Sequence, residues 1–539
     1  MKNTIVLCAG KSKFSDSLSM VPVNGKPVIG WILDDLLQKG LDDLAVVIRP
    51  EDRRTRDFIG WAYSNKRVNV ALALPAGPTI LHSVQAGMRL CDLSHGIRIV
   101  LGDTLIRDHF DQPTDFVYTG LVEDTRRWCL VDVSPDALVL NYVEKPALGM
   151  ASPVALAGYY YLSDAEDFYR LLEDCLKNGG RELSDVLRCY GLEHLIHAGL
   201  AREWYDFGHI DRLVEARIRL LQPRFFNALV VNPVLNTITK TSQNNDKLQN
   251  ELDWYLSLPD VLQVLTPRIL SHHTLNGQVQ IVEEYYGYPT LAESYVYGDL
   301  DIELWESILR KVLRVHREFL SFPGVIPPDE IQAMYLGKTE ERLAALAQQS
   351  AYWQNILAQP FLQYNGRTLQ NIATLWPALR EQVWKISNSA SIHIIHGDFC
   401  FSNILFDVNS QIIRLIDPRG YFGRKGIYGD PRYDIAKLRH SISGLYDFIL
   451  ADLFTVEELA PGMFTGRVFA NEMQNMLAQY FDELLIAAGY SLDEIRLIEG
   501  LLFVSMLPYH QDHLMRQKML YLTGIKLINE VFDAKRLEI

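Results

Sequence analysis

Apolar residues in the first two-fifths of the chain form short runs, separated by segments with helical spacing. The runs at residues 4–8, 44–48, 68–74 and 97–101 are rich in Val, Ile and Leu, which is typical of buried strands. Residues 28–38 repeat their apolar positions with a helical period. This alternation predicts an α/β fold with a mostly parallel, Rossmann-like sheet that is covered on both faces.

The last three-fifths of the chain has a different pattern. Two short apolar runs, residues 404–406 and 412–416, flank a turn-forming Asp-Val-Asn-Ser segment and predict a hairpin. Residues 299–319, residues 340–384 and the stretch from 468 onward have helical spacing. These elements predict an α+β architecture that is separate from the first sheet.

A chain of 539 residues is longer than one hydrophobic core usually serves, so two or three domains are expected. Pro223 follows a predicted helix that begins near Ile210, and no long flexible linker is recognisable there. The sequence therefore predicts two domains, residues 1–222 and 223–539.

Composition narrows the classes of function. The net charge is −14 and no Lys/Arg-rich tract occurs, which disfavours a nucleic-acid partner. No charged leader precedes an apolar core and no apolar run could span a bilayer, so we expect a cytoplasmic protein without a membrane span. The six cysteines form no CxxC pair, which favours buried reduced thiols over disulfides or a zinc site. The oligomeric state stays open.

Residues 396–403 read His-Gly-Asp-Phe-Cys-Phe-Ser-Asn, and Asp417 follows the predicted hairpin. Phosphoryl transfer from ATP needs an acceptor hydroxyl held in line with the transferred phosphate and Mg²⁺ to neutralise its charge. One Asp orients the hydroxyl, while an Asn and a second Asp hold the metal. This set predicts Asp398 as the catalytic base and Asn403 and Asp417 as Mg²⁺ ligands.

At these residues the chain resembles the aminoglycoside phosphotransferase and choline kinase family, whose small-molecule kinases have the bilobal protein-kinase-like fold. The resemblance covers about the last three-fifths of the sequence. It implies that Lys240 on a strand binds the phosphates of ATP with Glu251 as its helix partner, that residues 282–287 hold adenine, and that Asp434 braces the catalytic loop. Asp417-Pro418-Arg419 replaces the Asp-Phe-Gly of protein kinases, which argues against an activation switch of that kind.

Candidate ligand-binding residues in the first domain follow its predicted strands, where ligands of such sheets bind. Gly10 permits a close backbone approach, and Lys11 and Lys13 could meet a triphosphate. Asp103 follows the strand at residues 97–101 and suits a hard cation. Asp206 is a second carboxylate that could share one Mg²⁺ with it.

The order of these elements resembles that of the sugar-phosphate nucleotidylyltransferases. The shared elements are Val-Asn-Gly-Lys-Pro-Val-Ile at 23–29, Val-Glu-Lys-Pro at 143–146, Ala-Gly-Tyr-Tyr at 157–160 and Trp-Tyr-Asp-Phe-Gly at 204–208. The resemblance implies nucleotide binding by the loop at Gly10 and by Gly77, and sugar-phosphate binding by Glu144 and Lys145. It also implies that Asp103 and Asp206 hold Mg²⁺, but it does not identify the nucleotide base.

The chain departs from that family at its first loop. The family reads GxGxR there and has a Lys before the Pro-Val-x-Gly-Lys-Pro element, where this chain has Lys11-Ser12-Lys13 and Leu18. Two explanations remain open: Lys11 or Lys13 substitutes in a shortened loop, or the domain has kept its fold and lost turnover.

Together the two resemblances imply a bifunctional enzyme. The kinase would use ATP to phosphorylate a sugar or small polyol, and the transferase would couple the product to a second nucleoside triphosphate for capsule or other surface polysaccharide synthesis. One alternative is a choline or ethanolamine kinase fused to a cytidylyltransferase, with a cation-binding cage formed from Tyr421, Phe422, Tyr428 and Tyr433. Another is a small-molecule kinase with a non-catalytic docking domain.

Overall fold

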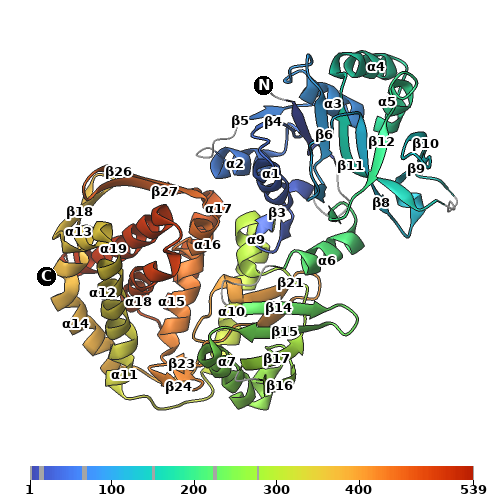
Figure 1. Cartoon of the computed structure of the whole chain (residues 1–539). Coiled ribbons are helices and arrows are strands. Elements are labelled where there is room, and N and C mark those ends of the chain that lie inside the picture. The colour runs from blue at the N-terminus through green and yellow to red at the C-terminus, as the bar shows by residue number, and fades with distance from the viewer. Residues whose placement is uncertain are drawn as a thin grey trace. The chain divides into compact units, whose positions relative to one another are not determined.

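The computed structural model of the chain (Figure 1) describes residues 3–10, 17–63, 69–147, 152–221, 227–275 and 278–537. The chain divides into two compact units between Leu220 and Leu221. We call residues 1–220 the N-terminal unit and residues 221–539 the C-terminal unit, and each is described by itself.

One mixed sheet forms the centre of the N-terminal unit, and its main strand order is β10-β9-β11-β6-β1-β4-β5. Its strands are β1 (Thr4–Leu7), β4 (Asp43–Val47), β5 (Asn69–Ala73), β6 (Ile97–Leu101), β8 (Phe116–Leu121), β9 (Cys129–Val133), β10 (Val139–Glu144), β11 (Val154–Leu162) and β12 (His197–Leu200). Strands β6, β1, β4 and β5 are parallel, as predicted. Strands β11, β9 and β10 run antiparallel to their neighbours, so the sheet is mixed rather than mostly parallel.

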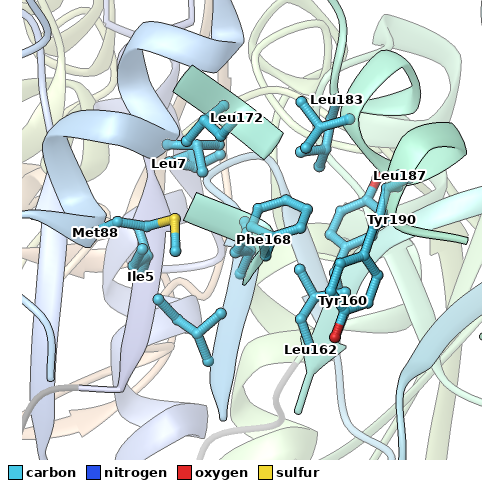
Figure 2. Packing of buried hydrophobic residues seen from close by; sticks show 14 of the residues in the cluster. Ile5, Leu7, Met88, Tyr160, Leu162, Phe168, Leu172, Leu183, Leu187 and Tyr190 are labelled. Atoms are coloured by element: carbon cyan, nitrogen blue, oxygen red, sulfur yellow. The ribbon is translucent and has the colours of Figure 1, made fainter. Parts of the chain in front are cut away.

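The described part of the N-terminal unit has six helices. They are α1 (Val28–Gln38), α2 (Arg53–Ala62), α3 (Ile80–Met88), α4 (Ala165–Lys177), α5 (Leu183–Tyr190) and α6 (Ile210–Arg219). Helix α3 packs on β1 and β4. Figure 2 shows Ile5 and Leu7 of β1 in the same cluster as Met88 of α3 and Phe168 of α4. Val6 points to the opposite face and is also fully buried, so β1 is covered on both faces, as its uninterrupted apolar run predicts.

Two small strand pairs complete the unit. They are β2 (Pro22–Val23) with β3 (Lys26–Pro27), and β7 (Thr104–Ile106) with β13 (Trp204–Asp206). The first pair turns at Asn24 and Gly25, which have φ values of 48° and 84°. Asn-Gly suits such a turn because both residues adopt positive φ at low cost.

The C-terminal unit begins with a four-stranded antiparallel sheet in the order β14-β15-β17-β16. The strands are β14 (Asn227–Asn232), β15 (Thr237–Ser242), β16 (Ile269–Leu275) and β17 (Gln278–Glu284). Helix α7 (Asn245–Ser257) packs Leu248 and Leu252 against Val279 and Ile281 of β17. This packing fixes the helix beside the central strands.

Helices dominate the remainder of the C-terminal unit. They are α8 (Asp260–Gln263), α9 (Leu291–Tyr297), α10 (Ile302–Phe319), α11 (Pro328–Gln332), α12 (Lys338–Gln349), α13 (Ala351–Ala358), α14 (Ile372–Asn388), α15 (Pro431–Ile442), α16 (Tyr446–Leu450), α17 (Glu472–Ala487), α18 (Leu492–Ser505) and α19 (Leu514–Leu537). The short strands are β18 (Phe361–Tyr364), β19 (Arg367–Gln370), β20 (His393–Ile394), β21 (Ile404–Asp407), β22 (Ile412–Leu415), β23 (Tyr421–Phe422), β24 (Arg424–Lys425), β25 (Tyr428–Gly429), β26 (Phe454–Ala460) and β27 (Met463–Val468).

The predicted hairpin is confirmed, because β21 and β22 pair antiparallel. The prediction of helix throughout residues 340–384 is wrong in one place, where β18 and β19 form a hairpin between α13 and α14. Asn365 and Gly366 make its turn with φ values of 50° and 78°. The Asn-Gly pair is a strong hairpin signal, and the helical spacing around it had obscured it.

Among the described residues, no helix is both long enough and apolar enough to cross a membrane. In the described ranges, the cysteines form no disulfide. Cys8 and Cys400 are buried and the other four are half-buried, so the expectation of buried thiols holds for two of them.

Candidate active sites

The first candidate site lies at the carboxyl ends of β1 and β6. The backbone N–H of Gly102 donates to the carbonyl oxygen of Leu7 at 2.9 Å. A Cβ at position 102 would lie 2.5 Å from that oxygen, so only glycine permits this approach. Asp103 follows directly, and its carbonyl accepts a hydrogen bond of 2.8 Å from the N–H of Phe207. This bond and the pairing of β7 with β13 bring Asp206 to Asp103.

Asp103 and Asp206 interact electrostatically. Burial, and after it the charge of the nearby Asp206 carboxylate, raise the pKa of Asp103 to about 6. Nδ1 of His209 lies 2.7 Å from Oδ2 of Asp206, and this hydrogen bond raises the pKa of His209. A Cβ on Gly208 would lie 2.6 Å from Oδ2 of Asp103 and 3.3 Å from Oδ1 of Asp206. Glycine therefore leaves space beside both carboxylates.

This pair fits the ligand chemistry of Mg²⁺, which proteins hold through one or two carboxylates together with substrate phosphates and water. In the described ranges, neither Asp103 nor Asp206 has a lysine or arginine within ion-pair distance. No group of three or more His, Cys, Asp or Glu side chains suited to a metal occurs in the described part of the chain. Among the described residues, the one basic side chain at ion-pair distance is His209, on Asp206, so the two carboxylates and the space beside them suit a cation that arrives with its phosphate ligand.

The predicted sugar-phosphate residues lie at the end of β10. Nζ of Lys145 is 3.3 Å from Oε1 of Glu144, whose Oε2 accepts a hydrogen bond of 3.1 Å from Ser184. Lys145 has a φ of 39° and its N–H donates to the carbonyl of Trp128 at 3.0 Å. The Lys145 side chain is 57% exposed, so it can reach a ligand.

Tyr160 of β11 links the two groups of residues. Burial raises its pKa, and the charges of Glu144 and Asp103 both raise it further. Glu144 and Asp103 are therefore both within electrostatic range of one side chain of the sheet. We call Asp103, Asp206, Glu144 and Lys145 the N-terminal site.

The predicted nucleotide-binding glycines both follow parallel strands. Gly10 is exposed just after β1, and a Cβ there would meet nothing within 4 Å. Gly77 lies between β5 and α3, where a Cβ would come within 2.5 Å of the His82 ring. Lys11 and Lys13 lie outside the described residues, so their predicted contact with a triphosphate stays a prediction.

The second candidate site begins at Lys240 of β15. Its Nζ lies 2.7 Å from Oε1 of Glu251 in α7, and it also pairs with Oδ1 of Asp417, which follows β22. Burial alone would lower the pKa of Lys240, but the charges of Asp417, Glu251 and Glu283 raise it above its ordinary value. Lys240 is therefore a fixed cation that joins the sheet, α7 and the segment after β22.

Asp398 is held on both of its carboxylate oxygens. Nδ2 of Asn403 donates to Oδ2 of Asp398 at 3.0 Å and to its carbonyl oxygen at 2.9 Å. Nζ of Lys437 in α15 lies 2.9 Å from Oδ1. The Asp398 side chain is still 31% exposed, so its orientation is fixed while an acceptor hydroxyl can reach it.

Asp434 of α15 braces the loop that carries Asp398, as predicted. Its two carboxylate oxygens accept hydrogen bonds from the backbone N–H groups of His396 at 2.7 Å and Gly397 at 2.8 Å. Burial raises the pKa of Asp434 to about 7, while these two bonds oppose the shift. On the other side of the loop, the indole N–H of Trp254 donates to the carbonyl of Ile395 at 2.7 Å.

Asn403 and Asp417 lie at the two ends of the β21–β22 hairpin, and the N–H of Ile416 donates to the carbonyl of Asn403 at 3.0 Å. Asp417 has a φ of 57°, a left-handed conformation that Asp tolerates better than most residues. Its side chain is 25% exposed. An amide oxygen and a carboxylate are hard oxygen ligands, so these two residues fit Mg²⁺. We call Lys240, Glu251, Asp398, Asn403 and Asp417 the C-terminal site.

Two residues near this site were missed by the sequence reasoning. Glu283 of β17 is buried beside Lys240, and burial raises its pKa to about 8. Glu283 lies on the same face of β17 as the buried residues Val279 and Ile281, so the alternation of side chains along a strand predicts that Glu283 is buried too. Lys437 follows Asp434 by three positions, and helical spacing put both side chains on the face that meets the loop.

Comparison with known proteins finds similarity in the N-terminal unit. Residues 15–222 match a protein-family model described as nucleotidyl transferase. Glucose-1-phosphate thymidylyltransferases from two strains of Xanthomonas campestris pv. campestris, B100 and ATCC 33913, are each 26% identical over 215 residues, which is 37% of this chain and 72% of each relative. The structure of a UDP-glucose pyrophosphorylase from Acinetobacter baumanii has a TM-score of 0.35 and 18% identity, and the match covers 42% of this chain and 95% of that one. Over residues 15–222 the chain is nucleotidyltransferase-like in sequence, and the N-terminal unit has the predicted α/β fold, with a mixed sheet.

Proposed function

We propose that the chain is a bifunctional transferase, in which the C-terminal unit phosphorylates a small hydroxylated compound and the N-terminal unit couples the resulting phosphate to a nucleotide. The observation that carries the N-terminal part is the pair of half-buried Asp103 and buried Asp206, at the strand ends of a unit that matches the nucleotidyl transferase model. The observations that support kinase activity in the C-terminal unit are the ion pair between Lys240 and Asp417 and the hydrogen bond that orients Asp398.

In the proposed kinase reaction, the acceptor oxygen attacks the γ-phosphorus of ATP, the bond from that phosphorus to the β–γ bridging oxygen breaks, and ADP leaves. Asp398 accepts the proton of the acceptor hydroxyl. Lys240, fixed by Glu251, holds donor phosphates. Mg²⁺ held by Asn403 and Asp417 would neutralise phosphate charge.

In the proposed transferase reaction, a phosphate oxygen of the sugar phosphate attacks the α-phosphorus of a nucleoside triphosphate and pyrophosphate leaves. Lys145 and Glu144 bind the sugar phosphate, with the lysine supplying positive charge to the phosphate. The loop at Gly10, with Lys11 and Lys13, holds the triphosphate. Mg²⁺ held by Asp103 and Asp206 would supply charge neutralisation at the reacting phosphates.

The two reactions form a sequence, since the product of a sugar kinase is the substrate class of a sugar-phosphate nucleotidylyltransferase. The matched relatives are named for glucose 1-phosphate and thymidylyl transfer, so a hexose 1-phosphate with dTTP is the first pair to test. We propose that the nucleotide-activated product serves capsule or other surface polysaccharide synthesis.

A second candidate for the N-terminal unit is a docking domain without turnover. The residue that favours it is Leu18, which stands where the nucleotidylyltransferases have a lysine and lies in the 3₁₀ turn Leu18–Met20. Pyrophosphate release by the full chain separates the two proposals. Release with glucose 1-phosphate and any one of dTTP, UTP, CTP or GTP supports turnover, whereas no release with any of them in the presence of Mg²⁺ supports docking.

A further inference from the structure

A group of basic side chains lies beside Asp398 and has no role in the proposed function so far. The hydroxyl oxygen of Tyr433 accepts two hydrogen bonds, from Nη1 of Arg419 at 2.8 Å and from Nζ of Lys338 at 3.3 Å. Arg342, one helical turn after Lys338 on α12, donates from Nη2 to the hydroxyl of Tyr509 at 2.7 Å. We call Lys338, Arg342 and Arg419 the basic cluster.

The basic cluster donates to tyrosine hydroxyls and, from Nη1 of Arg342, to the carbonyl oxygen of Ser505 at 3.0 Å, rather than to carboxylates. Within the described ranges, no carboxylate lies at ion-pair distance from any of its three members. Burial lowers the pKa of Lys338, and the charges of Arg419, Arg342 and Lys437 lower it further. Burial and the charge of Arg419 likewise lower the pKa of Arg342. These side chains therefore repel one another, which costs free energy unless an anion is bound.

The backbone also departs from regular helix at this place. Residues Ala333–Gly337 form a π-helical turn between α11 and α12, directly before Lys338. Such turns are rare and occur often at functional sites, because the additional residue changes the direction of the following side chains. Within this turn, the hydroxyl of Tyr335 donates to Oδ2 of Asp430 at 2.9 Å, which anchors the turn to the start of α15.

The basic cluster is close to the proposed catalytic base. A Cβ at Gly397, next to Asp398, would lie 2.7 Å from Cβ of Arg419. Arg419 thus packs against the loop that carries the base, and its N–H donates to the carbonyl of His396 at 2.9 Å.

We propose that the basic cluster binds an anionic group of the acceptor, a phosphate or a carboxylate, while Asp398 holds the acceptor hydroxyl. This inference rests on the proposed kinase function and adds the charge of its substrate. Arginine and lysine that converge on one point bind phosphate and carboxylate oxygens through charge-assisted hydrogen bonds. The tyrosine hydroxyls hold the three basic side chains in position without supplying a negative charge.

The same contacts disfavour the choline or ethanolamine alternative. Two aromatic residues considered for a cation-binding cage, Phe422 and Tyr433, are 1% exposed. Nζ of Lys338 already lies 5.1 Å from the centroid of the Tyr433 ring, and the Arg419 guanidinium carbon lies 6.0 Å from it. A quaternary ammonium compound would be repelled by these charges.

Titration calorimetry on the full chain tests the proposal without knowledge of the acceptor. The donor site is first saturated with the ATP analogue AMP-PNP and Mg²⁺, and inorganic phosphate or acetate is then titrated. The variants are Lys338→Gln and Arg342→Gln, and the matched control is Lys385→Gln, whose lysine pairs with Glu381 on the exposed surface of α14. We expect one of the two anions to bind the wild type and the control, and to bind each cluster variant at least about tenfold more weakly. Binding of phosphate or of acetate identifies the anion class.

Binding of AMP-PNP separates the possible failures. If wild type binds AMP-PNP but neither anion, or if the cluster variants bind the anion as the control does, the anionic acceptor is refuted while the kinase proposal stands. If the cluster variants lose AMP-PNP itself, the cluster holds donor phosphates instead. If wild type does not bind AMP-PNP, the kinase proposal fails first, and the acceptor inference fails with it. Thermal unfolding shows whether each variant is folded. If one cluster variant is misfolded, anion binding by the other cluster variant tests the proposal.

Discussion

Asp103 and Asp206 face one another without a described lysine or arginine at ion-pair distance, whereas Asp398 and Asp417 each pair with a lysine. The N-terminal pair carries like charges that burial makes costly, and a bound cation would relieve that cost. In the C-terminal site, Asp398 pairs with Lys437, while Asp417 and Glu251 share Lys240. The comparison separates a carboxylate pair that has no described lysine partner from carboxylates that each contact a lysine, and we expect the first pair to depend more on a bound cation.

This difference predicts that the N-terminal site loses more on removal of a carboxylate. Asp103→Ala should abolish Mg²⁺-dependent pyrophosphate release from glucose 1-phosphate and dTTP, or from whichever pair the wild type uses, because one of two cation ligands is lost. Pyrophosphate is measured in a coupled assay, and ADP formation by the same variant serves as the control. An unaffected rate would remove Asp103 from the metal site.

The prediction for Asp398 concerns turnover rather than binding. Asp398→Asn should lower ADP formation by at least about a hundredfold, since a positioned acid–base group is lost while the hydrogen-bonding shape is kept. AMP-PNP affinity should stay within a few-fold, because Lys240, Asn403 and Asp417 are intact. Steady-state kinetics and calorimetry check the two parts. Turnover equal to that of the wild type would refute the assignment of Asp398 as base.

Lys240 should contribute to binding of the donor. Lys240→Met removes a charge-assisted contact to phosphate, and we expect AMP-PNP to bind about tenfold or more weakly. The variant also leaves Glu251 and Asp417 without their shared cation, so its thermal unfolding must be recorded alongside. Affinity unchanged in a folded variant would show that Lys240 is structural only.

The smallest predicted effect is on stability, and it compares the two units directly. Without Mg²⁺, Asp103→Asn should change the free energy of unfolding of its unit little or raise it, because a like-charge repulsion is removed. Asp434→Asn should lower that of the C-terminal unit by about 1–3 kcal/mol, because one of two buried N–H groups loses its acceptor. Denaturant titrations give both values. Equal losses in both variants would contradict the contrast in charge balance.

Local patterns predicted the parts of the fold that depend on neighbouring residues. Alternating apolar runs predicted β1, β4 and β6, and the order of Asp398, Asn403 and Asp417 is the basis of the proposed kinase site. The antiparallel half of the first sheet was not predicted, because the direction of β11 depends on pairing between residues far apart in the chain.

Contacts between distant elements were also beyond the sequence reasoning. The basic cluster joins α12 to the segment after β22, so nothing in the spacing of Lys338 and Arg419 indicates that they meet. Their convergence on the Tyr433 hydroxyl depends on the packing of α12 and α15. Glu283, by contrast, had a usable signal in the alternation of its strand.

The central claim is that one chain carries two separate nucleotide sites, and a crossed binding experiment tests it most directly. The full chain and its Asp103→Asn and Lys240→Met variants are titrated with Mg²⁺ and AMP-PNP, and then with each of dTTP, UTP, CTP and GTP. We predict that Lys240→Met weakens AMP-PNP at least about tenfold and spares one of the other nucleotides, while Asp103→Asn does the reverse. The account would be contradicted if one folded variant lost binding of both ligands, or if both variants bound both ligands as the wild type does.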